Sequence, residues 1–355
     1  MTVMKEVASK QNISRCLNTA LSAEFDFYDA ELLPFSVYGV FREGGSFVRM
    51  PRRIAQRVSE AVAVRNEHTA GGRIRFVTDS SRVALVASVA PGGGMPHFAY
   101  TGVSGFDLYG SCGEGMRCFG TFVPQPDHAG MVEGIVELCT GERRTIQINM
   151  PLYNCVKKVY IGVEKGCVPA PAAPLNGPPI VYYGSSITQG GCASRPGNCY
   201  PSIISRRFNT NIYNLGFSSG GCGEENILEY MAKLDFSIFV MDYDYNAPTV
   251  EHLENTHKNA YNIIRKHNPD APIILVSKPD IRLYVEDDLK RREIIRKTYN
   301  DAVAQGDKNV YFVDGYTLFG EYGHDACTVD GTHPNDLGFW RMAEFIVCVI
   351  ESLLK

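Results

Sequence analysis

The sequence predicts an α/β protein in two parts, an antiparallel β-sandwich followed by a three-layer domain built on a parallel sheet. The chain has 355 residues, more than a single core usually needs. The pattern of hydrophobic residues changes along the chain, from short runs with alternating apolar residues to continuous apolar strands that alternate with helices. A proline-rich stretch, 168–179, separates the two patterns and is typical of an extended linker. We therefore expect a β-sandwich domain at 1–166, a linker at 167–179 and an α/β domain at 180–355.

The first half carries β-type runs in which apolar and polar residues alternate, with glycine between the runs. Period-two alternation broken by turn residues predicts antiparallel strands. The clearest runs are 73–77, 83–89, 105–109, 145–150 and 156–163. One segment, from Pro51 to Val64, has apolar residues near helical spacing and predicts a short helix.

The second half contains five short apolar runs with amphipathic helices between them. Buried strands separated by helices imply a parallel sheet with right-handed crossovers, and five strands fit a flavodoxin-like three-layer arrangement. The predicted strands are Ile180–Tyr183, Asn211–Leu215, Ser237–Asp242, Ile273–Ser277 and Val310–Asp314. The predicted helices are Tyr200–Phe208, Glu225–Leu234, Val250–Lys266, Asp288–Gln305 and Leu337–Leu353.

Composition excludes several function classes. The 35 basic and 39 acidic residues give a formal net charge of −4, and no dense basic block invites nucleic acid. No apolar stretch reaches the roughly 18 residues of a membrane span, and the N-terminus MTVMKEVASKQN lacks the apolar core of a signal peptide. The 11 cysteines are irregularly spaced, with no Cys-x-x-Cys pair. We therefore expect a reduced, cytoplasmic protein without a metal site.

Five chemically useful residues follow the predicted strands. In a doubly wound sheet, ligands bind beyond the carboxyl ends of the strands. Ser186 follows the first strand, Gly216 the second and Asn246 the third, while Asp330 and His333 share the loop before the final helix. The topology thus gathers these residues at one edge of the sheet.

These residue types suit acyl transfer. A serine hydroxyl becomes a nucleophile when an adjacent base takes its proton, and histidine fits that role near neutral pH. An aspartate orients the imidazole, and Asp330 lies only three residues before His333. The predicted donors to the oxyanion are the backbone N–H groups of Ser186 and Gly216 and the side-chain amide of Asn246.

The same segments resemble the sequence blocks of SGNH/GDSL hydrolases, in the order that the family has them. Gly184–Gly190 resembles the first block, with Gly-Ser-Ser in place of the usual Gly-Asp-Ser. Asn214-Leu215-Gly216 resembles the glycine block and Asp330–Asn335 the Asp-x-x-His block. Asn246 matches the asparagine block, although Asp-Tyr-Asn-Ala departs from the usual Gly-x-Asn-Asp. The resemblance covers about 178–355.

The N-terminal half resembles the jelly-roll-like β-sandwich that precedes the catalytic domain in one branch of this family, which includes carbohydrate esterases and acyltransferases. The resemblance implies a serine esterase that hydrolyses short-chain acyl esters, with acetyl esters of a carbohydrate as the leading substrate. It implies no cofactor, no nucleic acid and no membrane, and it leaves homo-oligomers open. Two alternatives remain: an acyltransferase with the same triad, and a carbohydrate-binding protein with a degenerate site.

Other residues have both a functional and a structural interpretation. Ser185 competes with Ser186 as the nucleophile, since either serine could instead cap the following helix. Arg195, Asp244 and Tyr245 are candidate substrate contacts, but a structural salt bridge for Arg195 and packing for the other two are equally compatible with the sequence. His252, His257 and His267 lie on or beside one predicted helix and are interpreted as solvated.

Overall fold

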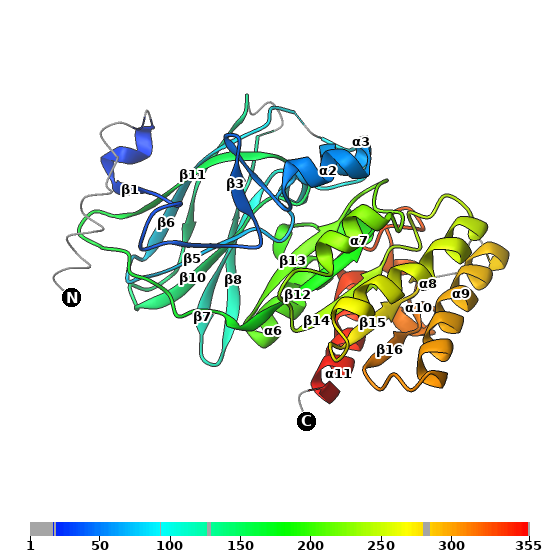
Figure 1. Cartoon of the computed structure of the whole chain (residues 1–355). Helices are drawn as coiled ribbons and strands as arrows, with labels where there is room; N and C mark the ends of the chain where they lie inside the picture. Colours follow the sequence, from blue (N-terminus) through cyan, green and yellow to red (C-terminus); the bar gives the residue numbers. More distant parts are fainter. Residues whose placement is uncertain (1–16, 18, 93, 126–128, 280–284, 354–355) are drawn as a thin grey trace. The chain divides into compact units, whose positions relative to one another are not determined.

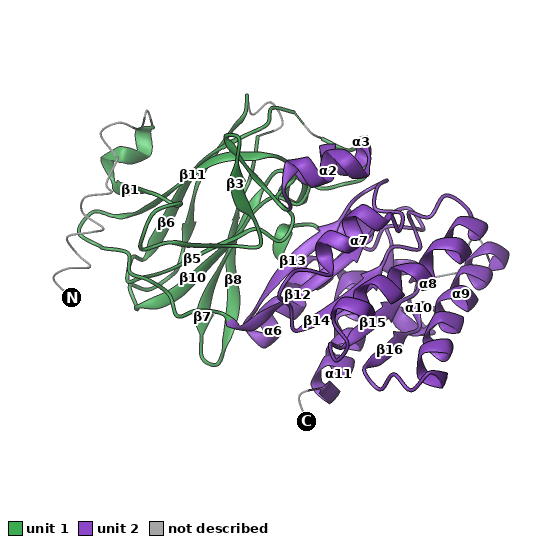
Figure 2. Cartoon of the chain, viewed as in Figure 1, with its two compact units in different colours: residues 1–49, 67–175, 194–197 green, residues 50–66, 176–193, 198–355 purple. Residues whose placement is uncertain are grey.

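The computed structural model describes residues 17, 19–92, 94–125, 129–279 and 285–353 (Figure 1). The N-terminal twelve residues, on which the absence of a signal peptide was predicted, lie outside this part. The chain divides into two compact units (Figure 2). Unit 1 comprises 1–49, 67–175 and 194–197, and unit 2 comprises 50–66, 176–193 and 198–355.

Unit 1 is built from antiparallel sheets, as the alternating runs predict. A four-stranded sheet has the order β1 (Phe25–Asp29), β11 (Val156–Glu164), β6 (Arg82–Val89), β9 (Met131–Glu137). A five-stranded sheet has the order β2 (Ser36–Tyr38), β5 (Arg73–Thr78), β10 (Arg144–Asn149), β7 (Phe106–Cys112), β8 (Gly115–Phe122). A hairpin, β3 (Phe41–Glu43) and β4 (Ser46–Val48), and the short helices η1 (Ala20–Ala23) and α4 (Tyr100–Val103) complete the unit.

One apolar core joins the two large sheets of unit 1. Phe76 and Leu108 from the five-stranded sheet belong to the same buried cluster as Leu85 and Ile161 from the four-stranded sheet. Such interdigitation of two inner faces is what defines a sandwich. All five predicted β-runs are strands of this unit, so the predicted antiparallel sandwich is confirmed.

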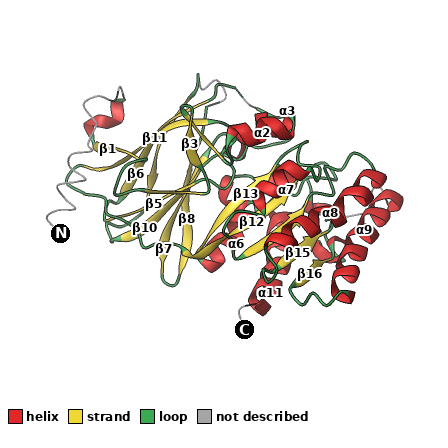
Figure 3. Ribbon diagram, viewed as in Figure 1, coloured by secondary structure: helices red, strands yellow, loops and turns green. Residues whose placement is uncertain are grey.

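Unit 2 is a parallel sheet covered by helices (Figure 3). The strand order is β13 (Thr210–Gly216), β12 (Asn176–Gly184), β14 (Ile238–Asp242), β15 (Ile273–Val276), β16 (Val310–Val313). The helices that follow β12 along the chain are α5 (Ser186–Gln189), η2 (Pro196–Asn198, at the unit boundary), α6 (Tyr200–Phe208), α7 (Glu225–Met231), α8 (Val250–His267), α9 (Val285–Ala304), α10 (Gly315–Leu318), η3 (Asp325–Cys327) and α11 (Asp336–Leu353). The chain's first strand in this unit lies between the second and third, which is the flavodoxin-like order.

Alternating residues of β12 face the two helical layers. Val181 and Tyr183 pack in one cluster with residues of α7, α8 and α9. Tyr182 points the other way, its ring edge-on to that of Tyr200 on α6, which in turn stacks on Phe339 of α11. Both faces of the sheet are therefore buried, which explains the continuous apolar runs of its strands. The predicted parallel sheet and its five predicted helices are confirmed.

The first residues of β12 fall within the predicted linker, 167–179. The Asn176 N–H donates to Asn209 O at 2.8 Å, and the register of β12 against β13 shifts between Asn176 and Ile180. Pro178 and Pro179 lie in this irregular stretch, where the missing N–H groups interrupt no regular ladder. The proline-rich composition thus marks an irregular strand start as well as a connection.

The helix predicted over Pro51 to Val64 is two helices, α2 (Arg52–Val58) and α3 (Glu60–Asn66). Ser59 between them is extended, and its Oγ accepts the Val62 N–H at 3.1 Å, which is the role of an N-cap. Both helices belong to unit 2, since Ala55 and Val62 are buried in its core with Ile227 of α7. The sequence prediction had placed them in the N-terminal domain.

His257 is not solvated, contrary to the sequence prediction. Its side chain is buried on the sheet-facing side of α8, stacked on Tyr243, with Nδ1 at 2.9 Å from Thr298 Oγ1. Burial lowers the pKa of His257 to about 3, so the ring is neutral. Among the helices that the structure describes, none has the length and apolarity that crossing a membrane requires.

Candidate active site

The two adjacent serines after β12 have different roles in the structure. Ser185 is the N-cap of α5, and its Oγ accepts the Ile187 N–H at 3.1 Å. Ser186 is the first residue of α5, and its Oγ lies 2.9 Å from Nε2 of His333. The hydroxyl of Ser185 thus caps the helix, whereas the hydroxyl of Ser186 lies within hydrogen-bond distance of the His333 imidazole.

Asp330 contacts the far side of the same imidazole. Its Oδ2 lies 2.8 Å from His333 Nδ1. Its Oδ1 accepts the backbone N–H groups of Thr332 and His333 at 3.0 and 2.7 Å. One carboxylate therefore shapes the turn and orients the ring, without help from a distant segment.

These contacts determine which nitrogen of His333 accepts a proton. Burial raises the pKa of Asp330, but hydrogen bonds from the His333 backbone and ring, with the ring's charge, outweigh it and hold this pKa below its usual value. An ionised carboxylate only accepts hydrogen bonds, so Nδ1 carries the hydrogen that faces Oδ2. Nε2 then presents a lone pair to the Ser186 hydroxyl, as a general base requires.

The other two predicted oxyanion donors have protein acceptors in this structure. The Gly216 N–H donates to Asn214 Oδ1 at 3.1 Å, and a Cβ at Gly216 would lie 2.4 Å from the Gln189 nitrogen. Glycine is thus required here by the close packing of β13 on α5. The Asn246 amide donates to Phe217 O at 2.7 Å and also to Gly220 O. The sequence did not predict these bonds, and the assignment of both donors to an oxyanion stays a prediction.

We expect Asn246→Ala to lower the free energy of unfolding by about 1–3 kcal/mol, because buried carbonyls of the 217–221 loop lose their donor. Chemical denaturation of the wild type and the variant measures this change. If Asn246 also donates to the oxyanion, kcat should fall by about 10²–10³-fold in the same variant, in addition to the loss of stability.

Two family models together cover most of the chain. The GDSL-like lipase/acylhydrolase family matches residues 178–351, and the N-terminus of SGNH-hydrolase-type esterases matches residues 25–168. The chain belongs to the GDSL-like lipase/acylhydrolase family. It is an SGNH-type esterase with the N-terminal domain of that branch. No curated protein sequence matches it significantly.

Solved structures share this two-unit GDSL architecture. A protein from Bacteroides ovatus, described as a GDSL-like lipase, is 28% identical, with a TM-score of 0.84 over 93% of this chain and 98% of its own. A salicylyl-acyltransferase from a tetracycline biosynthetic pathway is 18% identical, with a TM-score of 0.75 over 93% and 97%. An acetyl xylan esterase from Butyrivibrio proteoclasticus is 12% identical, with a TM-score of 0.55 over 93% and 98%.

Arg195 of this GDSL-family chain takes the structural alternative that the sequence left open. It belongs to unit 1, where its Nη1 lies 3.0 Å from Oδ2 of the fully buried Asp107 and its guanidinium lies over the ring of Tyr109. Burial lowers the pKa of Arg195, but the opposing effects of Tyr109 and Asp107 are larger together, so the pKa of Arg195 lies above its usual value. Asp107 Oδ2 also accepts the Gly197 N–H at 2.8 Å. These bonds hold Arg195 in a salt bridge, and its assignment as a substrate contact stays a prediction.

The sequence reasoning missed the part that Asp107 and Tyr109 play. They belong to the run Gly105-Phe106-Asp107-Leu108-Tyr109, which matches the Gly-x-Asp-Leu-Tyr motif that gives the N-terminal family model its name. The alternation of this run predicts a strand and does not by itself indicate a partner for Asp107. An aspartate in an apolar strand is a signal in itself, because a buried carboxylate needs partners.

Asp244 and Tyr245 take the packing alternative. Asp244 is buried, and its Oδ2 accepts the Lys278 N–H at 2.9 Å. Burial raises the pKa of Asp244 to about 6, against the opposing effects of that hydrogen bond and of Arg291 and Lys278. The Lys278 ammonium lies 4.4 Å from the centroid of the Tyr245 ring and 2.6 Å from Asp288 Oδ2. Asp244 is therefore buried in a structural cluster rather than displayed to a substrate, and Tyr245 packs against the same cluster.

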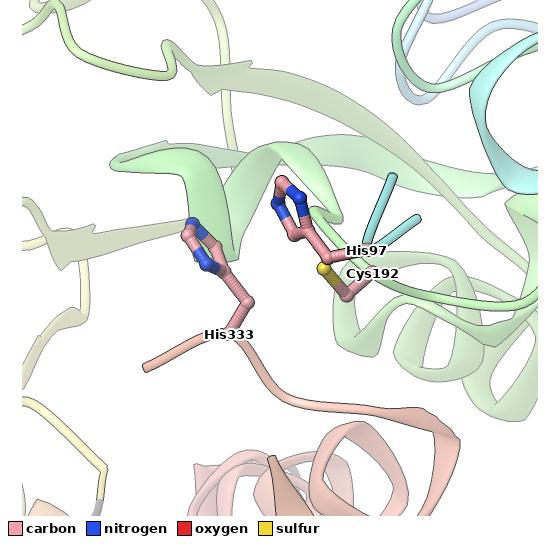
Figure 4. A group of neighbouring side chains, drawn as sticks. All are labelled: His97, Cys192 and His333. Atoms are coloured by element: carbon pink, nitrogen blue, oxygen red, sulfur yellow. The ribbon is translucent and has the colours of Figure 1, made fainter. Parts of the chain in front are cut away.

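Cys192 lies beside His333, which the sequence did not predict (Figure 4). Its Sγ is within 4.8 Å of a ring nitrogen of His333, and it is buried at a positive φ of 73°. Burial, with the charge of Asp330, raises the pKa of the Cys192 thiol to about 12. The thiol therefore stays protonated near neutral pH and does not rival Ser186 as a nucleophile. His97, also labelled in Figure 4, belongs to unit 1.

Proposed function

We propose that this SGNH esterase hydrolyses short-chain acyl esters, acetyl esters of a carbohydrate foremost, through a covalent intermediate on Ser186. The observation that supports it is the continuous relay in which Ser186 Oγ, His333 and Asp330 are joined by contacts of 2.9 and 2.8 Å. A nucleophile, a base and a residue that orients the base are the parts that ester cleavage needs.

The reaction has two steps that use the same groups. Nε2 of His333 takes the Ser186 proton as Oγ attacks the ester carbonyl, and the C–O bond to the alcohol breaks as His333 returns the proton to the leaving oxygen. His333 then takes a proton from a water molecule as the water oxygen attacks the acyl carbonyl. The bond to Ser186 Oγ breaks, His333 returns the proton to Oγ, and the acid is released. Asp330 stays ionised throughout and stabilises the imidazolium that forms in each half.

The negative charge on the tetrahedral intermediate needs donors that are already in place. Ser186 is the first residue of α5, directly after the N-cap Ser185, where the partial positive charge of a helix start favours a negative charge. We assign the Ser186 N–H as the first donor and keep Gly216 and Asn246 as the predicted second and third.

The choice of an acetylated sugar is supported by the kind of fold. The acetyl xylan esterase named above shares it, and so does a family two carbohydrate esterase from Clostridium thermocellum in complex with cellohexaose, at 15% identity and a TM-score of 0.55. At these identities the likeness is one of fold, and the experiment below identifies the acyl group and the alcohol. An acyl-enzyme can also pass its acyl group to an alcohol, which is the acyltransferase alternative.

The test is hydrolysis of p-nitrophenyl acetate, butyrate and octanoate, followed by acetate release from acetylated cello-oligosaccharide. We expect kcat/KM to be highest for acetate. The products are then analysed with and without an acceptor alcohol, since a transesterified product in place of free acid would identify a transferase. Sugar binding without turnover of any ester would contradict the proposal and favour the carbohydrate-binding alternative.

A further inference from the structure

Three buried polar side chains of unit 2 meet below the nucleophile turn. Asp242 Oδ2 accepts the hydroxyls of Thr188 and Tyr200, each at 3.0 Å. Thr188 and Tyr200 are 0% exposed and Asp242 is 1% exposed. Each comes from a different element: Thr188 from α5, Tyr200 from α6 and Asp242 from the last position of β14. The proposed mechanism uses none of them.

The cluster holds α5 from both ends. Before the helix, the Ser185 N–H donates to Asp242 O at 3.1 Å. Within the helix, the Thr188 hydroxyl bonds the Asp242 side chain, and Thr188 O accepts the Asn214 amide at 2.7 Å. Ser186 lies between these two anchors, so its backbone position depends on them.

Gly184 allows this close packing. A Cβ on Gly184 would lie 1.9 Å from Thr188 Oγ1 and 2.5 Å from Asp242 O. Any other residue would push Thr188 away from β14, so the glycine at the end of β12 serves the contact between Thr188 and Asp242. A helix of only four residues has little stability of its own, which makes such anchors the main constraint on Ser186.

We propose that Asp242 is a positioning residue for Ser186: through the Thr188 hydroxyl it fixes α5, and so keeps Ser186 Oγ within hydrogen-bond distance of His333. This inference rests on the proposed role of Ser186. Catalytic geometry is sensitive to small displacements, and a shift of about 1 Å costs roughly 10²-fold in rate. The contact between Thr188 and Asp242 is therefore expected to influence kcat more than KM.

The charge of the carboxyl decides which replacement preserves the contact. Burial, then the charge of Asp244, raises the pKa of Asp242 well above its usual value, while the Thr188 and Tyr200 hydroxyls act in the opposite sense. This environment therefore favours the protonated, uncharged form of Asp242. An asparagine has the same shape and can accept both hydroxyls through its carbonyl, so Asp242→Asn is the conservative variant.

The test compares Thr188→Val and Asp242→Val with the conservative variants Thr188→Ser and Asp242→Asn. We expect each valine variant to lower kcat for p-nitrophenyl acetate by about 10–100-fold, with KM within about 3-fold of the wild type. The conservative variants should stay within about 3-fold in kcat. The double valine variant should be no slower than the worse single one, because both remove one contact.

Tyr200→Phe is the comparison variant: it removes the hydroxyl that lies 3.0 Å from Asp242 Oδ2 and 3.3 Å from Thr188 Oγ1, but it leaves the direct contact between Thr188 and Asp242 in place. It should lower the melting temperature but leave kcat within about 3-fold. Labelling of Ser186 by a fluorophosphonate supplies a readout without an ester substrate. A wild type that is not labelled would contradict the proposed function. A labelled wild type with Thr188→Val equal to it in labelling rate and kcat would overturn the positioning role alone, as would equal losses in Thr188→Val and Tyr200→Phe.

Discussion

Ser186→Ala is expected to lower kcat for p-nitrophenyl acetate by at least about 10³-fold, because removing the hydroxyl of a serine triad leaves only binding and oxyanion stabilisation. The methyl side chain fits the space of the hydroxyl, and alanine is favourable in a helix, so the free energy of unfolding should change by less than about 1 kcal/mol. Steady-state kinetics and chemical denaturation of the same preparations measure both quantities.

Ser185→Ala is the matched control, since it removes a neighbouring buried hydroxyl with a different task. Its Oγ caps α5 through the Ile187 N–H, and loss of an N-cap costs about 0.5–2 kcal/mol. We expect lower stability with kcat within about 10-fold of the wild type. If Ser185→Ala were inactive and Ser186→Ala active, the nucleophile would be Ser185 and the proposed mechanism would be wrong.

The second large effect is expected for Asp330→Asn, which should lower kcat by about 10³–10⁴-fold. The amide oxygen can still accept the N–H groups of Thr332 and His333, so the turn is kept. The amide nitrogen, however, donates toward Nδ1 of His333 and favours the ring form with hydrogen on Nε2, which cannot take the Ser186 proton.

The pH dependence of this deficit follows from the ionisation of Asp330. The pKa of Asp330 is lowered in the folded protein. Its carboxylate is therefore ionised at neutral pH, and the negative charge is lost only when the pH falls through this lowered pKa. Between about pH 6 and 9 the wild type keeps Asp330 charged, and the deficit of Asp330→Asn should persist over that window. A deficit of less than about 10-fold at every pH would remove Asp330 from the mechanism.

The sequence predicts the sheets and the relay because both depend on local or topological rules. Strand runs such as 273–277 are apolar, too short for a helix and flanked by predicted helices, and these features together identify them. Asp330 and His333 share one turn, while Ser186 and that turn are brought to one edge by the parallel topology. These features need no knowledge of individual side-chain directions.

What the sequence did not predict depends on where side chains point after packing. The side-chain amide of Asn246 and the N–H of Gly216 donate to nearby protein oxygens, and the spacing of residues in the sequence does not predict these hydrogen bonds. His257 is followed directly by the exposed Lys258, yet its own side chain is buried on the sheet-facing side of α8. Arg195 has a partner more than 80 positions away, at Asp107, and only the fold brings the two together.

The assignment of 50–66 to unit 2 and of 194–197 to unit 1 has an evolutionary consequence. The chain crosses between the units at 49/50, 66/67, 175/176, 193/194 and 197/198, so neither unit is a contiguous stretch of the gene. Recombination at a single breakpoint near residue 176 would separate Ala55 and Val62 from the core that they fill. Genes with this interleaved layout are therefore expected to be inherited whole, and exchange of either half with a simpler hydrolase would require several coordinated cuts.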